Sequence, residues 1–101
     1  MKGNTIAVFI DDLLSVGGPE KEFTFRGKYY FLETIFQKDK NLLDLYLDAY
    51  DNSDPSDKRY LETYHFYGED FSKCVSQFET AKIFDGLTIY EAEKEIEVLY
   101  G

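Results

Sequence analysis

A regular alternation of apolar and polar residues between positions 42 and 50 constrains the fold of this chain more than any other feature. Leucine or alanine stands at every odd position from 43 to 49, and aspartate or tyrosine stands at every even position from 44 to 50. Successive side chains of a β-strand point to opposite faces of a sheet, so the pattern predicts a strand with one buried face. A helical interpretation leaves Leu43 and Leu47 outside the apolar stripe. We therefore expect a strand here.

Three further segments have strand patterns, and the set predicts an antiparallel sheet of about four strands. The first segment alternates polar and aromatic residues, and Gly27 marks a tight turn into the second. The last follows the polar loop 51–57 and is rich in tyrosine and phenylalanine. The predicted strands are residues 22–26, 28–37, 42–50 and 58–67.

A helix is predicted before the sheet, because apolar residues at the N-terminus recur at helical spacing. The residues of this stripe are Ile6, Phe9, Ile10, Leu13 and Leu14. Asn4 or Thr5 is expected to cap the helix, and Gly17-Gly18-Pro19 is expected to end it. A strand over residues 6–10 is the alternative, but the helical spacing continues through Leu14.

The last third of the chain is predicted to form two helices, residues 70–81 and 88–95, that pack on the sheet. Thr88 and Glu91 have the spacing of a capping box, in which each residue bonds the backbone N–H of the other. The sequence alternates again after residue 95, so an edge strand at that end is left open as a second possibility. Together these elements predict an α+β fold in a single domain of residues 1–101.

The whole net charge of −9 lies past residue 40. Residues 1–40 hold six bases and six acids, whereas residues 41–101 hold five bases and fourteen acids. Such a charge repels nucleic-acid phosphates and anionic membrane surfaces, so we expect no direct contact with either. The charge favours a basic protein partner, although a purely solubilising role stays open.

Tyrosines and acids gather on the two strands beside the loop 51–57. If these strands pair across the loop, one sheet face is expected to carry the predicted partner-binding residues Asp44, Tyr46, Asp48, Tyr50, Tyr60, Glu62 and Tyr64. Tyrosine provides a large and fairly rigid contact area, and carboxylates select a basic partner. The alternative is that helices cover this face, because the register across the loop cannot be read from the sequence.

Residues for catalysis or metal binding are sparse. His65 is the single histidine and is expected at the surface or hydrogen-bonded on a strand, whereas Cys74, the single cysteine, is expected in the core. The loop 51–57 departs from a calcium-binding pattern because Pro55 falls on a liganding position. We therefore predict no catalytic residue, no metal and no cofactor.

These features predict a small acidic protein-binding module that is not an enzyme. By composition alone it is compared with immunity proteins and antitoxins, which inhibit basic partners such as toxins or nucleic-acid-binding proteins. One alternative is a homo-oligomeric structural or accessory protein, and a second is a small enzyme or ligand binder around His65. The single cysteine excludes an internal disulfide and favours the cytoplasm. No apolar stretch approaches the roughly 20 residues of a membrane span.

Overall fold

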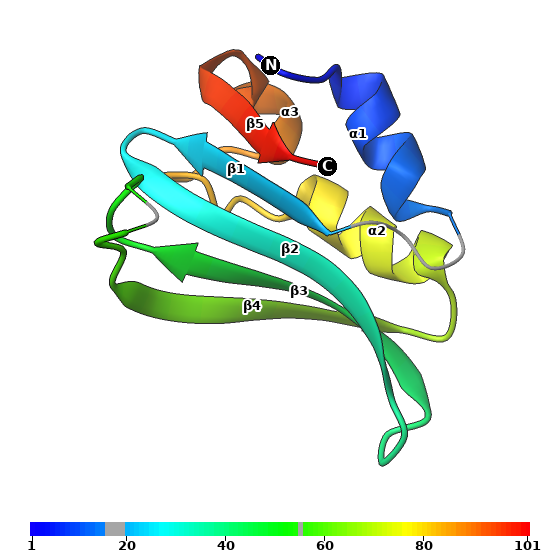
Figure 1. The fold of residues 1–101 in the computed structure, drawn as a ribbon. Coiled ribbons are helices and arrows are strands. Elements are labelled where there is room, and N and C mark those ends of the chain that lie inside the picture. Colours follow the sequence, from blue (N-terminus) through cyan, green and yellow to red (C-terminus); the bar gives the residue numbers. More distant parts are fainter. Residues whose placement is uncertain (16–19, 55) are drawn as a thin grey trace.

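The computed structural model describes residues 1–15, 20–54 and 56–101, which form a five-stranded antiparallel sheet with helices packed on one side (Figure 1). The elements in chain order are α1 (Ile6–Leu13), β1 (Lys21–Phe25), β2 (Lys28–Gln37), β3 (Leu42–Tyr50), β4 (Tyr60–Gly68), α2 (Phe71–Thr80), α3 (Ile89–Ala92), the 3-10 turn η1 (Glu93–Glu95) and β5 (Ile96–Tyr100). The predicted α+β class is confirmed, with five strands in place of about four.

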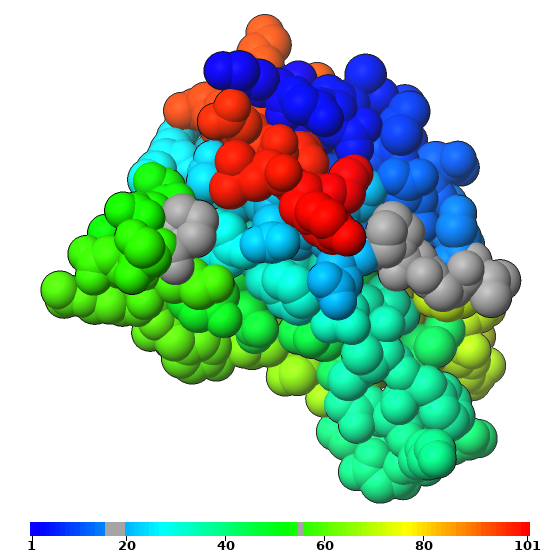
Figure 2. Space-filling model, in the orientation of Figure 1, coloured from blue at the N-terminus to red at the C-terminus, as the bar shows by residue number. Residues whose placement is uncertain are grey.

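The strands lie in the order β4-β3-β2-β1-β5, and each neighbouring pair is antiparallel. β2 and β3 form the longest hairpin, which runs from the pair Tyr29–Tyr50 to the pair Gln37–Leu42. Asn41 in its turn has a φ of 53°, a conformation that asparagine tolerates better than most residues. The end of this hairpin projects from the rest of the molecule (Figures 1 and 2).

The fifth strand comes from the C-terminal end of the chain, where the sequence alternates. The predicted helix 88–95 is shorter than expected, because its last residues form η1 and the chain becomes extended at Ile96. β5 then pairs with β1 and extends the sheet beyond the hairpin strands. The possibility of an edge strand at this end, left open by the sequence, is therefore confirmed.

The core lies between the sheet and the helices, and Phe84 is at its centre. The Phe84 ring lies 5.2 Å from that of Tyr30 on β2, 5.8 Å from that of Phe25 on β1 and 6.3 Å from that of Phe78 on α2. Rings at these separations add favourable edge-to-face contacts to the burial of apolar area. Cys74 is fully buried in the same core, as predicted, and burial raises the pKa of its thiol.

Side-chain caps start each of the three helices. The Thr5 hydroxyl accepts a hydrogen bond from the N–H of Val8 at 3.3 Å, and an Asp70 carboxylate oxygen accepts one from the N–H of Lys73 at 2.8 Å. The capping box that the sequence predicts for α3 is present between Thr88 and Glu91. The predicted stop signal of the first helix, residues 17–19, lies outside the described residues.

The two edges of the sheet differ in whether another segment of the chain pairs with them. The edge at β5 is covered by the N-terminus, since the Lys2 N–H donates to the Ile96 carbonyl at 2.9 Å and the Val98 N–H donates to the Lys2 carbonyl at 2.8 Å. Gly3 allows this approach, because a Cβ there would meet the Val98 carbonyl oxygen at 2.6 Å. β4 forms the other edge and has no further described strand on its outer side.

Candidate functional site

The sheet face opposite the helices carries the candidate site, which we call the open face. Residues that pair directly in an antiparallel sheet point to the same face, so the registers β2–β3 and β3–β4 define its members. They are Tyr29, Phe31, Glu33, Ile35, Gln37, Leu42, Asp44, Tyr46, Asp48, Tyr50, Tyr60, Thr63, His65 and Tyr67. The described helices pack against the other face (Figure 1), so no described helix covers these side chains, although Tyr29 and Asp44 are themselves buried.

Five of the seven predicted partner-binding residues lie together on the open face: Asp44, Tyr46, Asp48, Tyr50 and Tyr60. The expectation that Glu62 and Tyr64 share this face is wrong. Ala49 pairs with Glu62 but Tyr50 pairs with Tyr60, so Leu61 is an extra residue in a β-bulge. One extra residue reverses the phase of the alternation, which places Tyr60 on one face and Glu62 on the other.

Tyr64 therefore belongs to the helix-covered face, where it packs at the border of the core. Its hydroxyl donates to the carboxylate of Glu62, and burial together with this bond raises the pKa of Tyr64 to about 12. Thr63 and His65 take the corresponding places on the open face, opposite Asp48 and Tyr46.

Strand β2 also contributes residues that the sequence reasoning missed. Phe31 pairs with Asp48 and Glu33 pairs with Tyr46, so both extend the open face by one strand. Both are odd-numbered residues of the segment 28–37, so they lie on the same face of that strand. Pairing this segment with residues 42–50 as a hairpin places them beside the aspartates and tyrosines of β3.

The carboxylates of the open face are held by neighbouring donors. The Tyr46 hydroxyl donates to Glu33 Oε2 at 2.6 Å, and the Thr63 hydroxyl donates to the Asp48 carboxylate. Burial, the bond to Glu33 and the charges of Glu33 and Asp48 raise the pKa of Tyr46 well above its usual value. These hydrogen bonds fix the positions of both carboxylates on the open face.

Asp44 is less available than its place in the sequence indicates, because its side chain is almost fully buried. Its oxygen Oδ2 lies 2.9 Å from His65 Nδ1 and accepts a hydrogen bond from Gln37 Nε2 at 3.2 Å. A partner that docks on the open face therefore cannot reach this carboxylate directly. The expectation that Asp44 offers its charge to a partner by contact is corrected accordingly.

Tyrosines gather at the end of the open face near the loop 51–57. The Tyr29 and Tyr50 rings lie 5.6 Å apart, and the Tyr50 and Tyr60 rings lie 6.0 Å apart. Lys58 extends over this group, with its ammonium nitrogen 4.4 Å from the centre of the Tyr29 ring and 4.8 Å from that of Tyr50. Tyr29 is only 1% exposed, whereas Tyr60 is 60% exposed and is the most accessible ring of the group.

His65 is a half-exposed strand residue, which agrees with the prediction. Its ring stacks on the Tyr67 ring at a centroid distance of 5.4 Å, and it contacts the single carboxylate of Asp44. An enzyme or ligand site around His65 requires a hollow that holds the imidazole and at least two carboxylates. Among the described residues, the carboxylate in contact with the imidazole is that of Asp44 alone.

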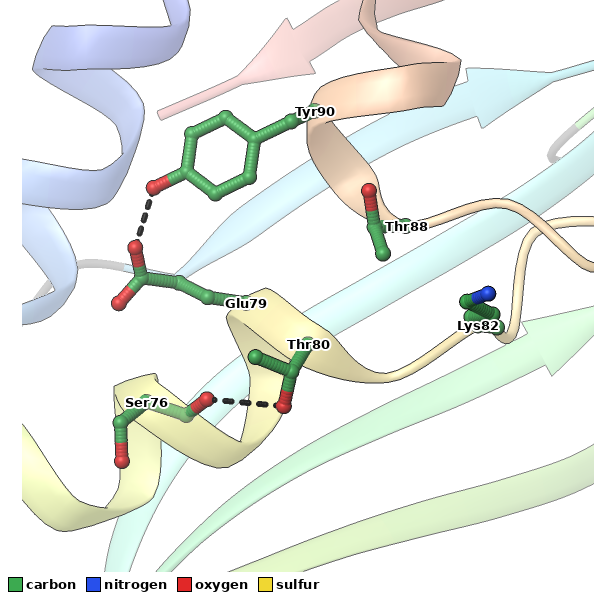
Figure 3. A pocket seen from close by; sticks show the side chains of 6 residues that line it. All are labelled: Ser76, Glu79, Thr80, Lys82, Thr88 and Tyr90. Carbon is green, nitrogen blue, oxygen red and sulfur yellow. Dashed lines mark hydrogen bonds between the residues drawn. The ribbon is translucent and has the colours of Figure 1, made fainter.

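A shallow hollow of about 540 Å³ lies on the helical side of the molecule (Figure 3). Its lining residues are Ser76, Glu79, Thr80, Lys82, Thr88 and Tyr90. The Tyr90 hydroxyl donates to Glu79, which raises the pKa of Tyr90 to about 12, and the Thr80 hydroxyl donates to the Ser76 carbonyl at 3.2 Å. These polar groups already bond one another, so we assign no ligand to the hollow.

Compared with protein-family models, curated proteins and solved structures, the chain matches none. Within the described residues, no group of three or more histidine, cysteine or acidic side chains is arranged to hold a metal ion. No helix among them is long and apolar enough to cross a membrane. The geometry of the sheet is therefore the basis for a functional proposal.

Proposed function

We propose that this chain is a small protein-binding module whose open face receives a basic protein and inhibits it, in the manner of an immunity protein or antitoxin. The observation that carries this proposal is the open face itself, because one side of the sheet presents tyrosines and carboxylates that no described helix covers. Most soluble domains bury aromatic side chains against another layer. Tyrosines left on a sheet face are suited to contact with another protein.

Electrostatics supports a partner of positive charge. The net charge of −9 speeds the encounter with a basic protein over distances of about a Debye length, and the carboxylates of Glu33 and Asp48 give it a local target. The hydrogen bonds from Tyr46 and Thr63 already order these carboxylates. Less side-chain entropy is then lost when the partner arrives, which favours affinity.

The proposal assigns no chemical step to the chain. His65 serves to hold the buried carboxylate of Asp44, and Cys74 serves as a core residue. A single cysteine is suited to a reducing compartment, so we propose that the partner is met in the cytoplasm.

An affinity capture with charge-reversed baits tests the proposal. The intact chain is expected to retain a basic protein from the native cell and to release it at high salt. Asp48→Lys on the open face should abolish the capture. Asp11→Lys on the exposed side of α1 changes the net charge equally and should leave it unchanged. Equal loss with both baits, or a retained protein that is not basic, would contradict the proposal.

Inhibition is tested on the captured protein after purification. Its activity on nucleic acid or another substrate should fall when the intact chain is added in equimolar amount and should return with the Asp48→Lys chain. Light scattering of the free chain addresses the homo-oligomeric alternative, because a strict monomer is incompatible with it. Full activity in the presence of a saturating intact chain would remove the inhibitory part of the proposal.

A further inference from the structure

The outer edge of β4 offers unpaired backbone groups that can be assigned to particular residues. In an antiparallel pair, alternate residues direct their N–H and C=O toward the neighbouring strand. The Asp51 N–H donates to the Arg59 carbonyl at 2.8 Å, so the odd-numbered residues of β3 bond toward β4. Past the bulge at Leu61, their partners in β4 are the even-numbered residues Glu62, Tyr64, Phe66 and Gly68.

Thr63, His65 and Tyr67 consequently direct their backbone N–H and C=O away from the sheet. A second observation agrees, because the Tyr67 carbonyl oxygen accepts a hydrogen bond from Gln77 Nε2 of α2 at 2.6 Å and is thus reached from outside the strand pair. That bond occupies one end of the edge. The backbone groups of Thr63 and His65 remain as a pair of docking positions.

This edge lacks most of the features that protect edge strands. Lysine, proline, bulges and covering segments usually prevent another strand from pairing. Residues 60–70 contain neither lysine nor proline, and the bulge at Leu61 lies at the start of the strand and leaves the stretch that follows in regular register. The opposite edge of the sheet is covered through Lys2.

Charge selects the occupant of the edge. Residues 60–70 contain three exposed acids and no lysine or arginine; Glu69 pairs with Lys73 and Asp70 caps α2, so Glu62 is the acid of this stretch that no described lysine or helix start engages. A second copy of the chain would bring another net charge of −9 to the same edge. We infer that the β4 edge receives an extended basic segment of another polypeptide, which adds as a sixth strand through the backbone of Thr63 and His65.

This inference takes the positive charge of the partner from the proposed function but assigns it a different surface. A basic segment on the β4 edge would bond the backbone, whereas a globular partner on the open face would contact side chains. The two surfaces are adjacent, because Thr63 and His65 point their side chains to the open face and their backbone groups to the edge.

A matched pair of variants at Thr63 separates the backbone contribution from that of the side chain. Thr63→Ala and Thr63→Pro both lose the hydroxyl, but only proline removes the outward N–H, and proline is tolerated on an edge strand at such a position. The probe is an eight-residue peptide of alternating lysine and valine, and the control peptide replaces lysine with glutamate. The affinity for the lysine peptide should fall about tenfold in Thr63→Pro relative to Thr63→Ala. The glutamate peptide should not bind.

Hydrogen exchange of the unaltered chain provides a test that does not depend on the folding of a variant. Saturation with the lysine peptide should slow exchange of the Thr63 and His65 amides more than that of the other amides in β4. Equal affinity of Thr63→Pro and Thr63→Ala, unchanged exchange at both amides, or equal binding of the two peptides would overturn the inference. A dimer of the free chain that Thr63→Pro dissociates would also overturn it in favour of self-pairing.

The outcomes distinguish this inference from the proposed function. If Asp48→Lys abolishes capture of the basic protein while Thr63→Pro leaves the affinity for the lysine peptide unchanged, the open-face proposal is supported and the edge site is contradicted. If Thr63→Pro lowers the affinity for the peptide while Asp48→Lys leaves capture unchanged, the edge site is supported and the open-face proposal is contradicted.

Discussion

The two faces of the sheet are built from the same alternating strands but are held together by different forces. On the helix-covered face, Phe84 and its aromatic neighbours exclude water and gain from burial and dispersion. On the open face, stability comes from directed pairs such as Tyr46–Glu33 and Thr63–Asp48. Alternation in the strands gives the sheet two faces, and the face on which the helices pack becomes the core.

The largest expected effect is on the helix-covered face. Phe84→Ala should lower the free energy of unfolding by about 3–5 kcal/mol, because it removes a fully buried ring and leaves a cavity among four other aromatic rings. Phe36→Ala is the control, since that ring is 54% exposed, and it should cost less than about 1 kcal/mol. Urea denaturation measures both. Similar losses would show that Phe84 is not central to the core.

A smaller effect is expected from the buried polar group of the open face. Asp44→Ala should lower the free energy of unfolding by about 2 kcal/mol, because Gln37 and His65 lose a buried acceptor. Asp48→Ala removes a half-buried acceptor from the same strand and should cost less than about 1 kcal/mol. Thermal and urea unfolding of the two variants compare them directly. A larger loss for Asp48→Ala would reverse the assigned order of burial.

The sequence predicts the elements whose signals are local. The period of apolar residues locates α1 and α2, the alternation of 42–50 locates β3, and the Thr88–Glu91 spacing locates the start of α3. Each of these signals depends on residues that lie close together in the sequence. Their positions in the structure therefore follow from the sequence within a few residues.

The composition of the open face depends on register and was only partly predictable. The loop between β3 and β4 is too long to fix the pairing, and the bulge at Leu61 reverses the phase, so Glu62 and Tyr64 change faces. The burial of Asp44 likewise depends on His65, which is 21 residues away. Such features arise from long-range packing that no local pattern encodes.

Lys58 lies over two tyrosine rings of the open face, and its replacement tests how much this contact stabilises the fold. Lys58→Gln should lower the free energy of unfolding by about 1 kcal/mol, because the ammonium group no longer lies over the Tyr29 and Tyr50 rings. Lys38→Gln, in the exposed turn of the β2–β3 hairpin, removes the same charge and should have no measurable effect. Tyrosine absorbance should show increased exposure of Tyr29 in the first variant alone. Equal effects of the two variants would indicate a contribution from net charge only.

The smallest effect concerns the charged rim of the helix-covered face, where Arg26 contacts Asp85 at 3.4 Å and Glu95 at 2.7 Å. The Arg26 side chain lowers the pKa of Glu95, and Lys28 together with Arg26 lowers the pKa of Asp85. A carboxyl group whose pKa is lowered in the folded state stabilises the fold at pH values above its ordinary pKa, which is 3.8 for Asp85 and 4.5 for Glu95. This contribution is lost as the pH falls through the pKa of the folded state. The stability difference between the intact chain and Arg26→Gln should therefore be present at neutral pH and shrink as the pH falls below these ordinary pKa values. Urea midpoints measured across this range, at low and high salt, check the sign. A difference that grows as the pH falls would contradict the assigned pairs, and one that salt does not reduce would show that the effect is not electrostatic.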